Sequence, residues 1–358
     1  MERFGFVGLP NAGKSSLYNA LAGGGALAAP YAFATTDPNV GVASVPDTRL
    51  DRLAEMSASK KVVHAAVQFV DIGGLVEGAS KGEGLGNRFL AHIREVDAIV
   101  YVLRAFTDGD VPGPTDPMDH LSVVELELCL ADLETLEKQL ERKRKQAKID
   151  KAVAAEVASL DAAHAILAEG TPLYRSALPE ADREALQPWF LLTNRPVLAV
   201  VNIDESQLES AEEIAAPIRA ELGEHADVLP VCVQLEAEAA TLDAGDRAEM
   251  LEGLGLGEGA LPRFVHAAYH LLGLRTFLTT GDKESRAWTF KAGWKAPRCA
   301  GVIHGDLERG FIRAEVIRWD ELLEIGSWNK AKDVGKIRVE GKDYEVQDGD
   351  VLEIRHNT

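Results

Sequence analysis

The chain has 358 residues, of which 46% are hydrophobic and 27% charged, and a net charge of −19. This length suffices for two or three domains, each with its own core. No run of 18 apolar residues occurs and no basic, cleavable leader opens the chain, so we expect a cytoplasmic protein rather than a secreted or membrane-spanning one. Three widely spaced cysteines, Cys129, Cys232 and Cys299, form neither a disulfide framework nor a zinc pattern.

The first predicted strand, residues 3–7, leads directly into the sequence GLPNAGKS at residues 8–15. The G-x-x-x-x-G-K-S spacing predicts a phosphate-binding loop followed by a helix. In such a loop backbone N–H groups surround a phosphate, Lys14 reaches the β- and γ-phosphate oxygens, and Ser15 offers its hydroxyl to Mg²⁺. The nucleotide-binding residues expected here are Asn11, Ala12, Gly13, Lys14, Ser15 and Ser16.

Two further segments complete a predicted magnesium and γ-phosphate site. Residues 33–39, FATTDPN, show little regular pattern, and Thr35 is preferred over Thr36 as a Mg²⁺ ligand. Asp71 lies at the last position but one of the apolar run 66–72 and is expected to hold Mg²⁺ through water. Gly74 has the D-x-x-G spacing that lets a backbone N–H contact a γ-phosphate. Lys14, Asp71 and Gly74 are therefore the predicted catalytic residues.

The remaining pattern predicts an α/β fold. Apolar runs at 98–103, 197–202 and 228–233, separated by helical segments, predict a doubly wound, mostly parallel sheet. Residues 121–168 carry leucines at helical spacing and a break near 149–150, which indicates an inserted helical hairpin, with another helix over 179–192. After residue 274, short alternating runs at 287–290, 311–317, 337–339 and 351–354 predict a small β-grasp-like domain.

Base recognition is expected where the run 197–202 ends, in the sequence Asn202-Ile203-Asp204-Glu205. Guanine-binding loops use N-K-x-D, whose aspartate accepts hydrogen bonds from the guanine N1–H and N2–H₂ groups. Here Ile203 replaces the lysine, and the longer Glu205 replaces the aspartate. Because losing a well-placed buried acceptor can change selectivity by roughly 10²-fold, the motif argues against GTP. Val233 is expected to present its backbone N–H to the base.

The segments GLPNAGKS, FATTDPN, DIGGLVEGASKGEGLGNRFL and NIDE resemble the Obg-like ATPases of the YchF type, and the resemblance spans nearly the whole chain. It implies a P-loop nucleotide domain of the TRAFAC class that prefers ATP, a C-terminal TGS domain, and association with ribosomes. The expected boundaries are 1–119 and 195–274 for the nucleotide-binding (OBG-type G) domain, 120–194 for the helical insertion and 275–358 for the TGS domain. The family's N-x-x-E motif matches Asn202 and Glu205.

Three positions bear on catalysis. Leu75 stands where related GTPases place the glutamine that orients the attacking water, so slow hydrolysis is expected. Asn11 matches an asparagine that coordinates K⁺ in potassium-activated relatives, which makes K⁺ a candidate cofactor beside Mg²⁺. Many family members carry a histidine in the loop where this chain has Val111-Pro112-Gly113-Pro114. His120 follows nearby, and we expect it to be a solvent-exposed or capping residue.

Three hypotheses follow from these residues. The first is a slow ATPase switch whose nucleotide state is read by the ribosome, through ribosomal RNA or ribosomal proteins, without membrane or DNA partners. A GTPase translation factor and a nucleotide-gated adaptor with negligible turnover are the alternatives. The acidic total weakens the case for a nucleic-acid partner. Residues 275–358 are nevertheless neutral, and basic residues cluster over 138–151.

Overall fold

The computed structural model describes residues 1–23, 40–71 and 94–357. These residues divide into two compact units, and the first carries a six-stranded sheet. β1 pairs in parallel with β4 and β5, and β5–β6 and β6–β7 are also parallel. The predicted mostly parallel sheet is thereby confirmed. In sheet order the strands are β2 (Val40–Ser44), β4 (Ala66–Asp71), β1 (Arg3–Val7), β5 (Ala98–Arg104), β6 (Val197–Asn202) and β7 (Ala226–Val231).

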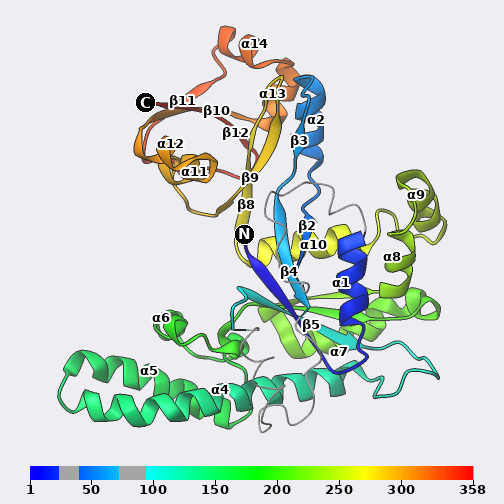
Figure 1. Ribbon diagram of the computed structural model, residues 1–358, viewed down its shortest axis with the longest axis vertical. Helices are drawn as coiled ribbons and strands as arrows, with labels where there is room; N and C mark the ends of the chain where they lie inside the picture. Colours follow the sequence, from blue (N-terminus) through cyan, green and yellow to red (C-terminus); the bar gives the residue numbers. More distant parts are fainter. Residues whose placement is uncertain (24–39, 72–93, 358) are drawn as a thin grey trace. The chain divides into compact units, whose positions relative to one another are not determined.

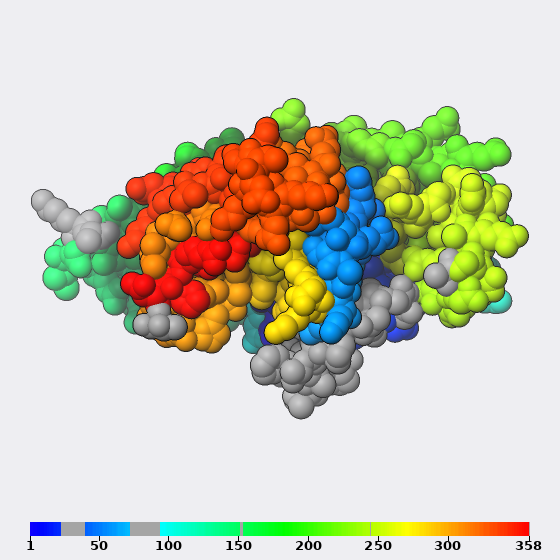
Figure 2. Space-filling model, turned by 90° about the horizontal axis from the view of Figure 1, so that it is seen from above, coloured from blue at the N-terminus to red at the C-terminus, as the bar shows by residue number. Residues whose placement is uncertain are grey.

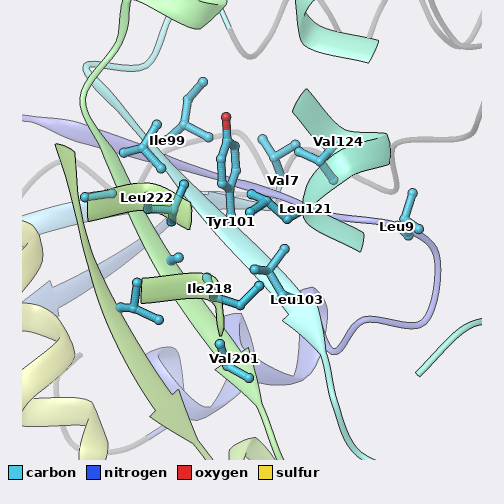
Figure 3. Close-up of a cluster of buried hydrophobic side chains, with 14 of the residues drawn as sticks. Val7, Leu9, Ile99, Tyr101, Leu103, Leu121, Val124, Val201, Ile218 and Leu222 are labelled. Atoms are coloured by element: carbon cyan, nitrogen blue, oxygen red, sulfur yellow. The ribbon is translucent and has the colours of Figure 1, made fainter. Parts of the chain in front are cut away.

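β5 is the centre of the first unit's core. All seven of its residues are buried, as expected for an inner strand of a parallel sheet covered by helices. Figure 3 shows the Tyr101 side chain of β5 surrounded by apolar residues of β1, β6, α4 and α7. The helices of this unit outside the insertion are α1 (Lys14–Gly23), α7 (Ala211–Leu222), α8 (Val233–Ala239), α9 (Ala244–Gly253) and α10 (Ala260–Leu271), the last of which continues into the second unit.

The inserted helical hairpin is confirmed: α4 (Pro117–Ala147) and α5 (Lys151–Ala168) run side by side (Figure 1). Asp116 caps α4 by accepting a hydrogen bond from the Met118 N–H, and Pro117 occupies the first turn, where no helical N–H partner is needed. Leu136 and Leu140 of α4 pack against Leu160 and Leu167 of α5 in a core of their own. α4 is therefore shared by two hydrophobic cores.

Two expected elements differ in extent. The strand expected over 228–233 is β7, which ends at Val231, because Val233 already begins α8. The helix expected over 179–192 is the short α6 (Glu180–Ala185), followed by 3-10 turns at Gln187–Trp189 and Leu192–Asn194. Pro188 explains the interruption, since proline lacks the N–H that a continuing helix requires.

The second unit contains a six-stranded sheet flanked by short helices, as predicted for the C-terminal domain. Phe277 and Phe290 of its strands pack against Cys299 and Ala300 of α11. The strands, in sheet order, are β11 (Arg338–Glu340), β10 (Phe311–Arg318), β12 (Asp350–His356), β8 (Leu274–Thr279), β9 (Ser285–Lys291) and β3 (Val62–Val63), and the helices beyond residue 290 are α11 (Ala296–Ile303), α12 (Gly305–Arg309), α13 (Trp319–Ile325) and α14 (Trp328–Asp333).

Residues 43–67 belong to this second unit although about 200 positions separate them from its C-terminal part. α2 (Thr48–Met56) and β3 lie in this segment, and β3 pairs in parallel with β9. Arg49 forms an ion pair with Asp348 at 2.7 Å, and the Arg52 guanidinium lies over the Trp319 ring. Figure 2 shows this segment in blue beside the orange C-terminal residues of the same unit. Neither α2, β3 nor β8 was predicted from the sequence.

Candidate nucleotide-binding site

The loop between β1 and α1 contains two residues with positive φ, Asn11 and Gly13, and both residue types tolerate this conformation. Gly13 has φ +97°, and Asn11 has φ 62°, a left-handed conformation that asparagine adopts more readily than most residues. A Cβ on Gly8 would lie 2.4 Å from the Val102 carbonyl oxygen, and one on Gly13 would lie 2.2 Å from Asn202 Nδ2. The two glycines therefore allow the loop to approach β5 and β6 closely.

Lys14 lies inside this loop with only 6% of its surface exposed. Its Nζ donates hydrogen bonds to the carbonyl oxygens of Gly8, at 3.0 Å, and Leu9, at 2.8 Å. Burial lowers the pKa of Lys14 to about 8, while the nearby Asp71 carboxylate acts in the opposite direction. The ammonium group thus lies in a pocket of backbone dipoles where phosphate oxygens could take the place of the two carbonyls.

The hydroxyl of Ser15 donates a hydrogen bond to Asp71 Oδ2 at 2.7 Å. A hydroxyl and a carboxylate are hard oxygen ligands of the kind that Mg²⁺ prefers, so this pair fits the predicted ion. Among the described residues, no three His, Cys, Asp or Glu side chains cluster as a metal site. Thr35, Gly74 and Leu75 lie outside the described residues.

Asn202 ties the phosphate loop to the segment expected to hold the base. Its Nδ2 donates to the Ala12 carbonyl oxygen at 3.0 Å, and its Oδ1 accepts from the Val233 N–H at 3.3 Å. The side chain is 4% exposed, and the neighbouring Ile203 is also buried. The Val233 N–H, which we expected to face the base, is thus bonded to Asn202 in this structure.

Asp204 and Glu205 differ in their surroundings. Asp204 Oδ2 accepts from the Thr107 N–H at 3.1 Å, and its Oδ1 accepts from the Ser206 hydroxyl. Burial acts to raise the pKa of Asp204, but the hydrogen bonds from Ser206 and Thr107 together outweigh it, so the pKa is lowered. Glu205 is exposed at the start of a 3-10 helix, Glu205–Ser210.

A cavity of about 490 Å³ lies beside these segments. Gly13 and Ser16 form its phosphate end, and Val233 borders it where α8 begins. Its remaining walls are residues 106–108, 202–204, Gln234, Ala237, Glu238 and Thr241. Ser16, Asn202, Ile203 and Val233, all predicted from the sequence, thus border one cavity, and Glu205 is absent from its walls.

The loop over residues 111–114 is held by three polar side chains. Arg104, 1% exposed, donates to the carbonyl oxygens of Val111 and Pro112. Asn11 Nδ2 also donates to the Pro112 oxygen, at 3.3 Å. His120 Nε2 lies 2.9 Å from the Pro114 oxygen. The loop following β5 is therefore bonded both to the phosphate loop and to α4.

His120 is not solvent-exposed, contrary to one of the two expectations. Its side chain is fully buried in the first turns of α4, and burial lowers its pKa. Leu121 and Val124 on the same helix pack in the core of the central sheet. His120 is buried because it lies in the same turn.

Sequence reasoning missed Arg104, Thr107, Gln234 and Glu238. Arg104 ends an otherwise apolar strand, and a cation at that position could have indicated a local acceptor cluster. Thr107 bonds to Asp204, which forms a capping box with Gln207. The spacing of that capping box is recognisable in the sequence, but its contact with Thr107 is not. Gln234 and Glu238 are one helical turn apart, so their shared face was also recognisable once α8 was placed.

Fold and site together define a P-loop nucleotide-binding protein, and comparisons with known proteins agree. The family model described as 50S ribosome-binding GTPase matches residues 3–150. A second model, YchF-GTPase_C, described as a protein of unknown function (DUF933), matches residues 274–357.

Full-length relatives narrow this class. The Bacillus subtilis protein named ribosome-binding ATPase YchF is 48% identical, with 99% of this chain and 98% of that protein covered. The Escherichia coli O157:H7 protein of the same name is 43% identical over the same shares. A solved structure of the Schizosaccharomyces pombe YchF GTPase superposes with a TM-score of 0.89 at 33% identity, covering 99% of this chain and 97% of that one.

The chain therefore belongs to the YchF family, which confirms the resemblance seen in its sequence. The same structural match confirms the predicted fold class. No helix in the described part of the chain combines the length and apolar character needed to cross a membrane.

Proposed function

We propose that this protein is a cytoplasmic, ATP-binding and slowly hydrolysing switch that associates with the ribosome. Two observations support the proposal. Lys14 and the Ser15–Asp71 pair lie in the phosphate loop, and Gly13 and Ser16 of that loop line one cavity together with Asn202. The names of the relatives from Bacillus subtilis and Escherichia coli, both ribosome-binding ATPases, support the activity and the partner.

The phosphate chemistry would divide among these residues. Lys14 neutralises charge on the β- and γ-phosphate oxygens, and the backbone N–H groups of residues 11–16 hold the phosphates in line. Ser15 and Asp71 would hold Mg²⁺, with Thr35 as a further proposed ligand and Gly74 as the proposed γ-phosphate contact. Bound Mg²⁺ supplies charge neutralisation at the phosphates. We also propose that the nucleotide-binding domain comprises residues 1–119 and 195–274, the helical insertion residues 120–194 and the TGS domain residues 275–358.

ATP rather than GTP is proposed because Glu205 stands where guanine-binding loops require aspartate, and because Ile203 replaces their lysine. The GTPase reading remains the competing one, since the Schizosaccharomyces pombe relative is titled a GTPase. Competition of ATP and GTP for one fluorescent nucleotide, with Mg²⁺ present, separates the two. We expect ATP to displace the probe at least 10-fold more effectively. Tighter binding of GTP would overturn the proposal.

Turnover is proposed to be slow and stimulated by K⁺ or by ribosomes. Leu75 cannot orient a water molecule, and Asn11 is the proposed K⁺ ligand. Single-turnover hydrolysis in Na⁺ and in K⁺, with and without ribosomes, tests this step. K⁺ should accelerate the wild type but not Asn11→Ala. Asn11→Gly, which also lacks the amide but accepts the left-handed backbone, controls for backbone strain. A chain that stays inert in every condition would instead be an adaptor.

A further inference from the structure

Arg104, the last residue of β5, is a buried cation whose charge no carboxylate balances. Its side chain is buried, and no Asp or Glu among the described residues forms an ion pair with it. Its guanidinium instead donates to three backbone carbonyls, those of Phe106 at 3.1 Å, Val111 at 3.0 Å and Pro112 at 3.1 Å. A buried charge without a counter-ion costs free energy, so a neutral side chain would be less costly if this position only filled space.

The three carbonyls close one loop, residues 105–112, onto the end of β5. The guanidinium is planar and carries five N–H donors in a fixed fork, so it holds oxygens from both ends of the loop at once. It also lies over the Phe106 ring, with the guanidinium carbon 4.4 Å from the ring centroid. This is a cation–π contact, which orients the ring. A lysine ammonium offers neither the fork nor the flat face.

The same loop forms a wall of the nucleotide cavity. Phe106, Thr107 and Asp108 line the cavity, whereas Arg104 does not. The backbone of the wall is held from β6, because the Phe106 N–H donates to the Asn202 carbonyl oxygen at 3.0 Å. That bond fixes the main chain but not the ring. Arg104 therefore contributes what the backbone bond does not, the orientation of the Phe106 side chain.

We propose that Arg104 is a positioning residue for nucleotide binding, which holds the Phe106 ring at the cavity wall without contacting the nucleotide. This inference rests on the proposed ATP-binding function and adds a residue outside the cavity to the binding site. Gly13 and Ser16 form the phosphate end of the cavity, whereas Phe106 is bonded to Asn202 in the segment expected to hold the base. Losing the guanidinium should therefore weaken binding of a nucleotide but not of a bare polyphosphate.

A second route leads from Arg104 to the phosphate loop. The Pro112 carbonyl oxygen that accepts from Arg104 also accepts from Asn11 Nδ2, at 3.3 Å. If this route dominated, a polyphosphate and a nucleotide would lose affinity alike. Inorganic tripolyphosphate, which has the phosphates but no base, distinguishes the two routes.

The test measures dissociation constants by calorimetry for ATP and for tripolyphosphate, each with Mg²⁺. The variants are Arg104→Lys, which keeps the charge but loses the fork, Phe106→Leu, which loses the ring, and the double variant. Arg104→Gln, which also removes the buried charge, replaces Arg104→Lys if that variant does not fold. Arg183→Lys is the matched control, because Arg183 is a partly buried arginine that donates to Asn194 Oδ1 and the Tyr174 carbonyl and does not line the cavity.

Arg104→Lys should weaken ATP about 5- to 10-fold, through the lost cation–π contact and hydrogen bonds, and change tripolyphosphate by less than about 2-fold. Phe106→Leu should weaken ATP about 10-fold. The double variant should match Phe106→Leu within about 2-fold, because without the ring the guanidinium has nothing to position. A purely structural role would not produce this non-additivity, and Arg183→Lys should leave both affinities unchanged.

Three results would overturn the inference and leave the proposed function intact: unchanged ATP affinity in Arg104→Lys, equal weakening of ATP and tripolyphosphate, or a double variant that shows the product of the single effects. A wild type that does not bind ATP would overturn the proposed function and this inference together. Unfolded protein lowers the measured stoichiometry equally for both ligands, so the ratio of the two dissociation constants is independent of it.

Discussion

The two ends of the cavity use their polar groups differently. At the phosphate end, Lys14 is bonded to two backbone carbonyls and Ser15 to Asp71, and Lys14 is buried. At the base end, Asn202 is bonded to backbone on both sides, but Gln234 and Glu238 are exposed. The phosphate end therefore resembles a preformed charge site, where one substitution removes several interactions. The base end is a surface whose individual contacts contribute less.

Replacing Lys14 should give the largest effect and mark the phosphate end. Lys14→Ala removes the buried ammonium, and two charge-assisted hydrogen bonds to phosphate are together worth about 3–6 kcal/mol, or at least 10²-fold in affinity. Calorimetry should show equal losses for ATP and GTP, since the change does not touch the base. The exposed Lys138 gives a matched control, and Lys138→Ala should bind normally. A loss confined to one nucleotide would contradict the division between the ends.

Replacing Asn202 should affect both ends at once. Asn202→Ala breaks the hydrogen bonds to Ala12 and Val233 and leaves a buried N–H without its partner, which should cost about 1–3 kcal/mol of stability. Affinity for both nucleotides should fall by roughly 10-fold, as measured by thermal unfolding and nucleotide titration.

Asn194 provides the comparison for that variant. Its side chain also makes two hydrogen bonds, both to Arg183, and it does not line the cavity. Asn194→Ala should lower the melting temperature but leave nucleotide affinity unchanged. If both variants lost affinity alike, Asn202 would matter only through general stability.

The smallest effect should appear in the pH dependence, which separates the ends without mutation. The pKa of Lys14 is lowered to about 8 and bound phosphate favours the charged ammonium, so affinity should be full below pH 8. Above that value it should fall, by at most about 10-fold per pH unit. ATP and GTP should lose affinity in parallel in a calorimetric titration from pH 7 to 8.5, where the loss stays at or below about 4-fold. Adenosine, which lacks phosphates, should not, and a parallel loss for adenosine would assign the titration to the base end.

The phosphate loop and the helical hairpin could be predicted because each is determined by a short segment of sequence. The phosphate loop follows from eight consecutive residues whose glycine and lysine spacing has one main chemical use. The hairpin follows from leucines at helical spacing, a pattern that survives whatever the helix packs against. These predictions needed no knowledge of distant contacts.

What the sequence could not supply depends on pairings between distant segments. β3 is only two residues long and exists because β9, more than 200 residues later, pairs with it. His120 is buried because its turn of α4 packs against the central sheet. The sequence shows only a polar residue near the start of a helix, and this does not predict burial. Within the basic cluster over 138–151, Lys143 and Arg144 form ion pairs with Glu156 and Asp161 of α5, partners that the local sequence does not reveal.

The length of α4 gives the molecule a mechanical property. Its 31 residues correspond to about 46 Å at about 1.5 Å per residue. Residues of its first half pack in the core beside β5, and residues of its second half pack against α5 (Figure 1). His120, near the clamped start, is bonded to the loop that also contacts Asn11. By lever geometry, a tilt of about 5° at that end would displace the hairpin tip by about 4 Å. A tilt at the start of α4 is thus amplified at the far end of the helix.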